Sequence, residues 1–538
     1  MLNSLRTRWQ TRFLPSDPTL ALVYLTTAVF GFTAIAHQNN LGATSSLLAG
    51  DSITQYGWVI GLTLLGLGLG FFVSRYVRDT ALVPMFIATE IVLTLVSGFS
   101  VVLAFWGYSN LPAVYIWFIR LVSLLISTLI GVEDAMLVRI AEKREQDVAE
   151  SVGLTFWFSN IGGALAGFSF GQLLIPQLGI FNLALVLGLL DGILVIVNLL
   201  YFRQQLRFVL VQIVFTAGIV LLLFITLLAN RSVTTLLTQQ LYEDKIAKEW
   251  NGAYGTKVLT CSPAGTCKLF INGQLQFSSK DEYQYHERLI HPAMAVVTER
   301  VKNRPLNVLI AGGGDGLAAR ELLKYDQVGA VTIVDLDPDM TNRVAMEEPV
   351  VSYNQGALKD QRVAVHNGDA FTYLRDTDDV FDLIVVDLVD PDTENTAKLY
   401  AEEFYRFAAR KLAHGGVFVT QSTSPWYAPR AFWTINLTLD TVFPEVVPLR
   451  WNIPSFGDWG WNVASNIPFD PQTLAIDETK TRGLTTEGWR ASLVFERDEL
   501  MLRDELQAKG IKSTLARPAV LLYYTEPGTW EDWGSNGD

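Results

Sequence analysis

At 538 residues the chain is too long for one typical domain, so at least two domains are expected. Half of its residues are hydrophobic and only 18% are charged, which is typical of a membrane protein rather than of a purely soluble one. The net charge of −13 comes mostly from the part after residue 230, disfavours nucleic acid as a partner and suits small cationic molecules.

Seven segments before residue 230 are long and apolar enough to span a bilayer, which requires roughly 20 residues each. These segments are Leu20–Ala36, Tyr56–Val73, Leu82–Phe105, Ala113–Val132, Val152–Ile175, Ile180–Tyr201 and Phe208–Ala229. Lys and Arg occur before the first span and in the loops after the second, fourth and sixth, so the positive-inside rule predicts a cytoplasmic N-terminus. Seven spans would leave the second half outside, which conflicts with an intracellular nucleoside. A single missed or falsely assigned span would reverse the predicted side of the membrane. The side on which the second half lies therefore stays open.

Three ionisable residues, Glu90, Arg120 and Asp191, lie within predicted spans. At ~1.5 Å per residue they fall near the middle of the membrane, where charged groups are costly and are usually paired or functional. The favoured interpretation is a structural pair between Arg120 and a carboxylate. The alternative is an acidic route for a cationic substrate.

Residues 231–290 change to short strands and predict a small β-subdomain, with strands at Tyr254–Thr260 and Lys268–Asn272. Cys261 and Cys267 lie in the same predicted hairpin. Two cysteines cannot form a structural zinc site by themselves. They are either two unpaired core residues or a disulfide, and the disulfide would require an oxidising compartment.

The stretch Asn307–Glu321, NVLIAGGGDGLAARE, reads as a strand, a glycine turn and the start of a helix. This arrangement lets backbone N–H groups approach a nucleotide closely. Asp335 follows the next apolar run and is placed to accept hydrogen bonds from ribose hydroxyls. Leu317 stands where the dinucleotide fingerprint requires its third glycine. The spacing of Gly312, Gly314 and Gly316 therefore favours a nucleoside without pyrophosphate, such as an adenosyl-sulfonium compound.

Strands and helices alternate after this turn, which predicts a parallel α/β sheet. A polar residue lies at or just beyond the end of each predicted strand: Asp315, Asp335, Asp369, Asp387 and Gln421. A single Asp after a strand is usually a helix cap, but open α/β sheets bind ligands at this edge, so five in succession predict a site.

Acidic residues and histidines also crowd the preceding stretch, FSSKDEYQYHERLIHPAM. His286 and His291 are five positions apart, which does not fit the His-x-x-x-His spacing of a metal site. A polar wall that binds amines is therefore favoured over a metal site.

These motifs, with VTIVDLDP, NGDAF and FDLIVVDLVDPD, closely resemble the spermidine synthase (polyamine aminopropyltransferase) family, specifically its membrane-anchored bacterial branch. The resemblance covers nearly all of residues 254–465. It implies a multi-pass α-helical cell-membrane domain (1–230), a small β-subdomain of the family's tetramerisation type (231–290) and an α/β, Rossmann-like domain similar to class I AdoMet methyltransferases (291–538).

The resemblance also implies transfer of an aminopropyl group from decarboxylated S-adenosylmethionine to putrescine or another diamine, giving a spermidine-type product and methylthioadenosine. No cofactor and no metal are expected. The partners would be the diamine, the adenosyl-sulfonium donor and the lipid bilayer, with no nucleic acid and with homo-oligomerisation left open. The donor would lie against Gln276, Gly312, Gly314, Asp315, Asp335, Gly368 and Asp369. The amine would lie against His286, Asp387, Asp390 and Gln421, with Asp387 as proton acceptor.

Two alternatives remain: an AdoMet-dependent methyltransferase on the same fold, and a non-catalytic polyamine sensor or transporter. A methyltransferase needs no base for an amine, so Asp387 and Asp390 count against it. Gly255, where the family usually has Gln, removes one expected donor contact. Arg450 stands near a segment of the expected amine pocket and would repel a second amino group.

Overall fold

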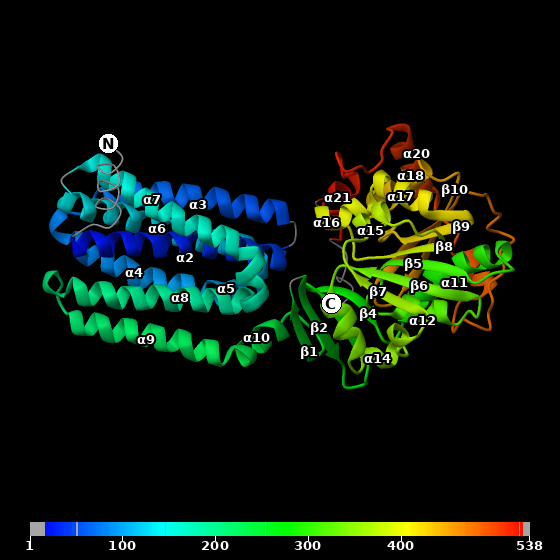
Figure 1. The fold of residues 1–538 in the computed structure, drawn as a ribbon, viewed down its shortest axis with the longest axis horizontal. Helices are drawn as coiled ribbons and strands as arrows, with labels where there is room; N and C mark the ends of the chain where they lie inside the picture. Colours follow the sequence, from blue (N-terminus) through cyan, green and yellow to red (C-terminus); the bar gives the residue numbers. More distant parts are fainter. Residues whose placement is uncertain (1–16, 50–51, 146, 253, 527, 531–538) are drawn as a thin grey trace, which may run out of the picture. The chain divides into compact units, whose positions relative to one another are not determined.

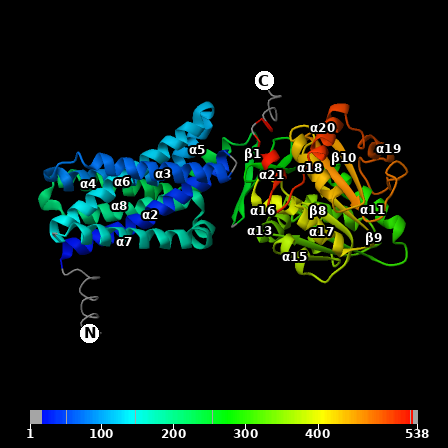
Figure 2. The same cartoon turned by 90° about the horizontal axis from the view of Figure 1, so that it is seen from above.

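The structure is a computed structural model that describes residues 17–49, 52–145, 147–252, 254–526 and 528–530. The chain divides into two compact units, Met1–Glu243 and Asp244–Asp538 (Figures 1 and 2).

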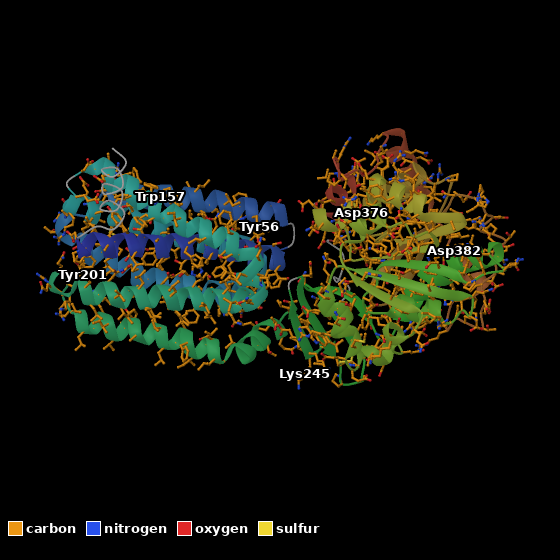
Figure 3. All side chains as sticks on the ribbon, viewed as in Figure 1. Tyr56, Trp157, Tyr201, Lys245, Asp376 and Asp382 are labelled. Carbon is orange, nitrogen blue, oxygen red and sulfur yellow. A yellow bond between two sulfur atoms is a disulfide. The ribbon has the colours of Figure 1, made fainter. Side chains whose placement is uncertain are left out.

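In the described part of the first unit, every regular element is a helix. Its helices are α2 (Pro18–Ala49), α3 (Ser52–Ser74), α4 (Leu82–Gly98), α5 (Ser100–Asn110), α6 (Tyr115–Glu145), α7 (Val148–Ser169), α8 (Ile175–Tyr201), α9 (Val209–Leu228) and α10 (Asn230–Gln239). Side chains that project from α9 end almost entirely in carbon (Figure 3), and Leu210, Val214 and Leu228 are exposed. Such a surface suits contact with lipid.

Six helical stretches in the described part of this unit are long and apolar enough to cross a membrane. One of them, Val148–Tyr201, has 54 residues and as a straight helix would be about 81 Å long, more than twice the thickness of a bilayer core. The ribbon instead reverses direction between α7 and α8 (Figure 1), where a π-helical turn at Phe170–Leu174 is followed by Gly179 at φ 68°. This stretch therefore contains two helices, each long enough to cross a bilayer, and the seven predicted segments correspond to α2, α3, α4, α6, α7, α8 and α9.

The predicted pair between Arg120 and a carboxylate is wrong. The Arg120 guanidinium lies 3.9 Å from the ring centroid of Trp58, and within the described residues it forms no ion pair. A guanidinium is attracted to the negative face of an aromatic ring, which lets it remain charged without a carboxylate. Glu90, bonded to Asn198, and Asp191, 3.8 Å from His37, therefore lack the expected Arg120 partner.

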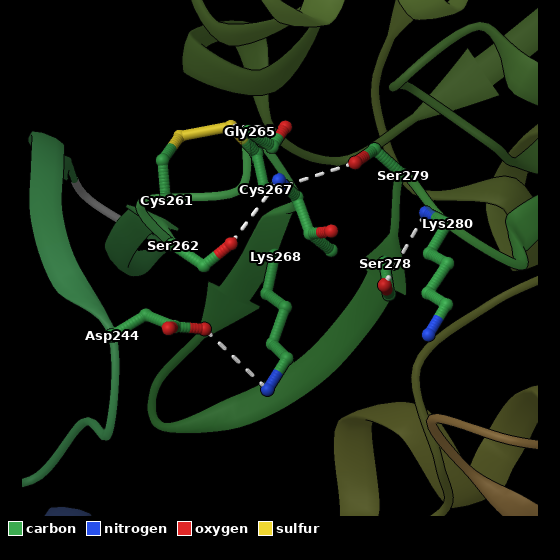
Figure 4. Close-up of a disulfide and its surroundings, with 10 residues drawn as sticks. Asp244, Cys261, Ser262, Gly265, Cys267, Lys268, Ser278, Ser279 and Lys280 are labelled. Carbon is green, nitrogen blue, oxygen red and sulfur yellow. Dashed lines mark hydrogen bonds and ion pairs between the residues drawn. A yellow bond between two sulfur atoms is a disulfide. The ribbon is translucent and has the colours of Figure 1, made fainter.

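The second unit begins with a four-stranded antiparallel sheet in the order β1-β2-β3-β4. Its strands are β1 (Lys245–Gly252), β2 (Gly255–Cys261), β3 (Cys267–Ile271) and β4 (Gln274–Ser278). Cys261 and Cys267 are directly opposite each other on β2 and β3 and form a disulfide (Figure 4). The structure thus decides between the two alternatives for these cysteines.

A seven-stranded sheet follows, in the order β10-β11-β9-β8-β5-β6-β7. Its parallel strands are β5 (Leu306–Gly312), β6 (Val328–Asp335), β7 (Val363–Asn367), β8 (Phe381–Asp387) and β9 (Leu412–Gln421). The antiparallel pair β10 (Glu445–Ile453) and β11 (Gly457–Ser465) extends the sheet beside β9. The predicted Rossmann-like α/β fold is confirmed.

Helices cover both faces of this sheet because its central strands are apolar on both sides. One core contains Val308 and Ile310 of β5 with residues of α11 (Glu282–Arg300) and α12 (Leu317–Leu323). The other contains Leu309 and Ala311 with residues of α15 (Ala370–Asp376), α17 (Glu402–Lys411) and α18 (Pro429–Asp440). The remaining helices are α13 (Pro338–Asn342), α14 (Val350–Tyr353), α16 (Glu394–Ala397), α19 (Thr486–Ala491), α20 (Arg497–Ala508) and α21 (Ala519–Tyr524).

Candidate active site

Polar side chains meet at the carboxyl edge of the parallel strands. Asp387 ends β8 and is in register with Gly312, the last residue of β5. Asp335 ends β6 beside Asn367 of β7, and Gln421 ends β9. Parallel strands all finish at one edge, which is where open α/β sheets bind ligands.

The glycine turn after β5 approaches two of these carboxylate residues closely. Gly312 and Gly313 have φ of 83° and 64°, which a residue with a side chain rarely adopts. The Gly313 N–H donates to the Asp387 backbone oxygen at 2.8 Å, and the Gly314 N–H donates to Asp335 Oδ2 at 3.0 Å. A Cβ on Gly314 would lie 2.5 Å from that same oxygen. The turn therefore forms a cradle beside Asp335 that any side chain would fill.

Asp335 accepts a second backbone hydrogen bond, from the Asp337 N–H to Oδ1 at 2.8 Å. Each carboxylate oxygen thus has one donor and retains a lone pair for a ligand hydroxyl. Burial raises the pKa of Asp335 to about 6, opposed by the two backbone donors. Asp337 is paired with the fully buried Lys257 of β2, a contact between the small sheet and this edge that the sequence did not predict.

Asp387 is surrounded by side chains from α11. The Tyr285 hydroxyl donates to its Oδ1 at 2.9 Å, and His286 Nε2 lies 3.9 Å from its Oδ2. His286, Asp315 and Asp387 each offer a ligand atom within 4.8 Å of the others, so by residue type this group suits a cation. Burial raises the pKa of Asp387 to about 6, while nearby His286 works against the rise.

His286 is itself held by a carboxylate. Its Nδ1 lies 3.0 Å from Glu282 Oε2, and both oxygens of Glu282 accept from Arg320, at 2.8 and 2.9 Å. Burial lowers the pKa of His286, but Glu282 and Asp387 raise it more strongly, to about 9. In this structure His286 is an imidazolium at neutral pH that balances the charge of Asp387.

Asp390 lies on the loop after β8. Its Oδ1 accepts from Gln421 Nε2 at 3.3 Å, its Oδ2 accepts from the Tyr524 hydroxyl at 2.9 Å, and burial raises its pKa to about 7. Gln421 also donates to the Leu388 backbone oxygen at 3.0 Å and bonds to the Tyr400 hydroxyl. With an exposed fraction of 1%, Gln421 positions this loop from behind it.

Two predicted donor residues form mainly local contacts. Asp369 caps α15 through the Phe371 N–H at 3.2 Å and pairs with Lys398 at 2.9 Å; burial raises its pKa, but Lys398 reverses this and the pKa is lowered. Gln276 donates to the Gln274 backbone oxygen at 3.1 Å. The described residues show no hydrogen bond from Gln276 to the Asp387 group. At Gly368, which precedes Asp369, no atom lies within 4 Å of the position that a Cβ would occupy.

The two departures from the family pattern have structural explanations. Gly255 has φ 112°, and a Cβ there would overlap the Asn272 amide, so the turn requires glycine. Arg450 pairs with Asp458 at 2.7 Å and with Glu499. Because two carboxylates compensate its charge, the expected repulsion of an amine by Arg450 does not follow.

Tyr524, Glu282 and Arg320 contribute to this group, and the sequence did not single out roles for them. Glu282 lies in the stretch FSSKDEYQYHERLIHPAM and Arg320 lies in the glycine-turn stretch NVLIAGGGDGLAARE. An acidic and a basic residue in two neighbouring motifs were therefore the only sequence signal for their pairing. Tyr524 lies 134 residues from Asp390, and no local pattern points to it.

Comparisons with known proteins find similar sequences along most of the chain. Residues 282–469 match the model of the spermine/spermidine synthase domain. The chain is 34% identical over 514 residues to a polyamine aminopropyltransferase of Oceanobacillus iheyensis, covering 95% of this chain and 98% of that one. It is 36% identical to polyamine aminopropyltransferase 1 of Streptomyces coelicolor, covering 93% and 92%. A spermidine synthase crystallised with the transition-state analogue AdoDATO aligns with 48% of this chain and 88% of its own, at 24% identity and a TM-score of 0.43.

Proposed function

The chain belongs to the spermine/spermidine synthase family of polyamine aminopropyltransferases, and we propose that it uses decarboxylated S-adenosylmethionine as donor and a diamine such as putrescine as acceptor. Aminopropyl transfer itself follows from the family, so it is favoured over the two alternatives, the methyltransferase and the non-catalytic sensor or transporter. The observation that carries the proposal is the Asp387 carboxylate, held by Tyr285 beside the glycine turn.

The donor would lie in the cradle formed by Gly312 and Gly314, with its ribose hydroxyls on the free lone pairs of Asp335. The backbone N–H groups that hold Asp335 keep both oxygens in fixed positions. Asp315 lies close to Asp387 and adds negative charge on the side where a sulfonium would be placed. No cofactor is required, because the donor carries its own leaving group.

The acceptor needs a base. An alkylammonium resembles Lys, whose pKa is ≈ 10.4, and has no lone pair for attack. Asp387 would attract the cation and take its proton, and the freed nitrogen lone pair would attack the carbon beside the sulfonium. The new C–N bond forms as the C–S bond breaks. The electron pair of the C–S bond stays on sulfur, which leaves as neutral methylthioadenosine.

His286 would change its charge when the amine enters. A cationic ligand beside it disfavours the imidazolium, so His286 would release its Nε2 proton to solvent as the amine binds, while Nδ1–H continues to donate to Glu282 Oε2. The vacated Nε2 lone pair would then accept a hydrogen bond from the ammonium. Asp390, positioned by Gln421 and Tyr524, would bind the second amino group.

We further propose that α2, α3, α4, α6, α7, α8 and α9 cross the cell membrane, with the N-terminus in the cytoplasm. An odd number of crossings leaves the chain after α9 on the outer side, so this part of the proposal requires the adenosyl-sulfonium donor to be supplied on that side. The disulfide Cys261–Cys267 supports this side, because disulfides persist in oxidising compartments.

The test uses the purified full-length protein with decarboxylated or intact S-adenosylmethionine, a panel of diamines, and release of methylthioadenosine as readout. We expect release only with the decarboxylated donor, and a loss of about 10²–10⁴-fold in Asp387→Asn with donor binding retained. Asp376→Asn, an exposed acid at the end of α15, is the matched control and should retain full activity. No release with any diamine, or full activity in Asp387→Asn, would refute the proposal.

A further inference from the structure

Buried polar side chains follow α8 through the membrane unit. Asn198 donates to Glu90 Oε1 of α4 at 2.7 Å, and its own oxygen accepts from the Thr26 hydroxyl of α2 at 3.3 Å. Further along α8, the Ile180 backbone oxygen accepts from Asn40 of α2 at 2.9 Å. Asn198 and Ile180 lie about 27 Å apart at ~1.5 Å per residue, close to the ~30 Å of a bilayer core. The side chains of this polar column are Thr26, Asn198, Glu90, Glu133, Asp191, His37, Ser97 and Asn40.

His37 and Asp191 meet at a small cavity in the middle of the polar column. His37 Nε2 lies 3.8 Å from Asp191 Oδ2, and Ser97 also lines the cavity. The cavity volume is about 10 Å³, which is the space of one water-sized group. Both ring nitrogens of His37 and the Oδ1 of Asp191 lack a hydrogen-bond partner, although the exposed fractions of these side chains are 2% and 1%. Buried polar groups are normally hydrogen-bonded, so these unsatisfied atoms need an explanation.

Two glutamates continue the polar column from this cavity. Asn198 and its partner Glu90 lie about two helical turns from Asp191 along α8, which places the two levels about 10 Å apart. Glu133 of α6 interacts electrostatically with both Glu90 and Asp191. One oxygen of Glu90 and both oxygens of Glu133 are unpaired. Acidic groups therefore connect the cavity with the far end of the column.

In the described part of the membrane unit, no Lys or Arg pairs with these acids. Arg120 lies over an aromatic ring, and the base that faces Asp191 is His37. Asp134, next to Glu133 on α6, adds a further acid, and α9, which packs against α8, has no titratable side chain. A carboxylate in an apolar bundle without a counterion takes up a proton, because the neutral acid is far easier to bury. The acids of the column are therefore groups that hold protons.

We propose that the polar column is a proton relay, through which the membrane unit carries protons across the bilayer. Ionisable side chains inside a membrane are costly, and chains of Asp, Glu and His are the groups that pass protons there. The cavity has room for one water and none for a larger cation, and in the described residues three converging His, Asp or Glu ligand atoms occur at the His286 group, not here. The proposal rests on the proposed membrane crossings and is independent of aminopropyl transfer.

Each transfer breaks one O–H or N–H bond and forms another, so no other reactant is consumed. A water in the cavity would accept the proton of Asp191 and give one of its own protons to His37. The water is thereby restored, and the Asp191 carboxylate takes a new proton from the side of Glu133 and Glu90. His37 then releases its extra proton toward Asn40, which lies about one helical turn further along α2 and has an unpaired Oδ1. The proton gradient sets the direction.

The experiment uses the full-length protein in liposomes, with a potassium gradient and valinomycin to set the membrane potential and a trapped pH-sensitive dye as readout. We expect the wild type to acidify the lumen faster than protein-free liposomes do. Asp191→Asn and Glu90→Gln cannot exchange a proton at these positions and should lose the protein-dependent rate. Thr216→Val is the matched control, because the buried Thr216 hydroxyl donates to the Gln212 backbone oxygen of its own helix, and it should keep the wild-type rate. Elution in size-exclusion chromatography checks that each variant is folded.

A wild type no faster than protein-free liposomes would overturn the proposal, and so would wild-type flux in Asp191→Asn or Glu90→Gln. Entry of choline as fast as that of protons would assign an open pore and would overturn it as well. Failure of the proposed function is seen separately. Absence of methylthioadenosine release would refute aminopropyl transfer without changing the proton flux, and maleimide labelling on intact cells tests the proposed side without involving the polar column.

Discussion

The Tyr285 hydroxyl donates a hydrogen bond to Asp387 Oδ1 at 2.9 Å, across the interface between α11 and the end of β8. The ring is packed against Phe456 and Trp461, with centroids 5.9 and 5.4 Å away, so its hydroxyl is fixed in direction. One oxygen of the proposed base is thereby occupied, and the other faces His286.

Tyr285→Phe should slow aminopropyl transfer about tenfold. It should also shift the acidic side of the plot of kcat against pH to higher pH. The hydroxyl stabilises the Asp387 carboxylate, so its loss raises a pKa that already lies at about 6. The measurement is kcat against pH for both proteins. Tyr283→Phe, the neighbouring tyrosine that stacks on Arg482, should leave the profile unchanged. An identical profile in Tyr285→Phe would show that Tyr285 does not act through Asp387.

The wild-type protein should lose kcat/KM for the amine as the pH falls below about 7. Burial raises the pKa of Asp390 to about 7 and that of Asp387 to about 6, and both must be ionised to bind and deprotonate an ammonium. Below both values the logarithm of kcat/KM should fall with a slope approaching about 3, because His286 also releases a proton when the amine binds. Rates measured at saturating donor between about pH 5 and 8 test this, and a flat profile contradicts it.

Gly314→Ala should raise the KM for the donor at least about tenfold, a loss of about 1.4 kcal/mol, with little effect on the KM for the amine. The added Cβ would lie 2.5 Å from Asp335 Oδ2 and would displace the carboxylate proposed to hold the ribose. Gly488→Ala on α19, where the nearest atom is 3.3 Å away, is the control for general effects of a methyl group. If Gly314→Ala and the wild type have the same KM for the donor, the glycine turn is not part of the donor-binding site.

Glu321→Gln should lower the unfolding free energy of the second unit by about 3 kcal/mol at neutral pH. Glu321 is buried and pairs with His291 at 2.8 Å, Arg320 at 2.9 Å and Lys324 at 2.6 Å. Burial raises its pKa, but these partners dominate and hold it at about 2, below the ordinary 4.5. The stabilisation is therefore present above pH 4.5 and is lost as the pH falls toward 2.

Urea unfolding of the full-length protein in detergent, repeated at falling pH, measures this loss. The difference between Glu321→Gln and the wild type should narrow below pH 4.5. The matched control is Glu505→Gln, which breaks an exposed pair with Lys509 and should change stability little. An equally stable Glu321→Gln at neutral pH would contradict the structural role of Glu321.

Cys261 and Cys267 should react with a membrane-impermeant maleimide on intact cells only after mild reduction. They are paired in the structure, which also leaves no free cysteine in the described chain. Labelling that requires lysis would place the second unit in the cytoplasm and refute the proposed side. Labelling without reduction would show that Cys261 and Cys267 are free thiols rather than a disulfide.

The sequence by itself determined where the ligand edge lies. Asp335 and Asp387 directly end apolar strands, and parallel strands must finish together, so local pattern and topology suffice to bring these carboxylates to one edge. The glycine turn is equally local, because Gly312 and Gly313 adopt a backbone conformation that disfavours side chains. The positions of the long apolar helices also followed from segment length and hydrophobicity alone.

Only the tertiary structure decided which partner each of these groups has. Tyr524 reaches Asp390 across 134 residues, Arg450 is neutralised by Asp458 and Glu499, and Arg120 lies over Trp58 rather than on a carboxylate. The charge of His286 likewise depends on Glu282, whose own orientation is set by Arg320. Hydrogen bonds and ion pairs act over a few ångströms, and the spacing of residues along a chain does not specify which distant side chains come within that range.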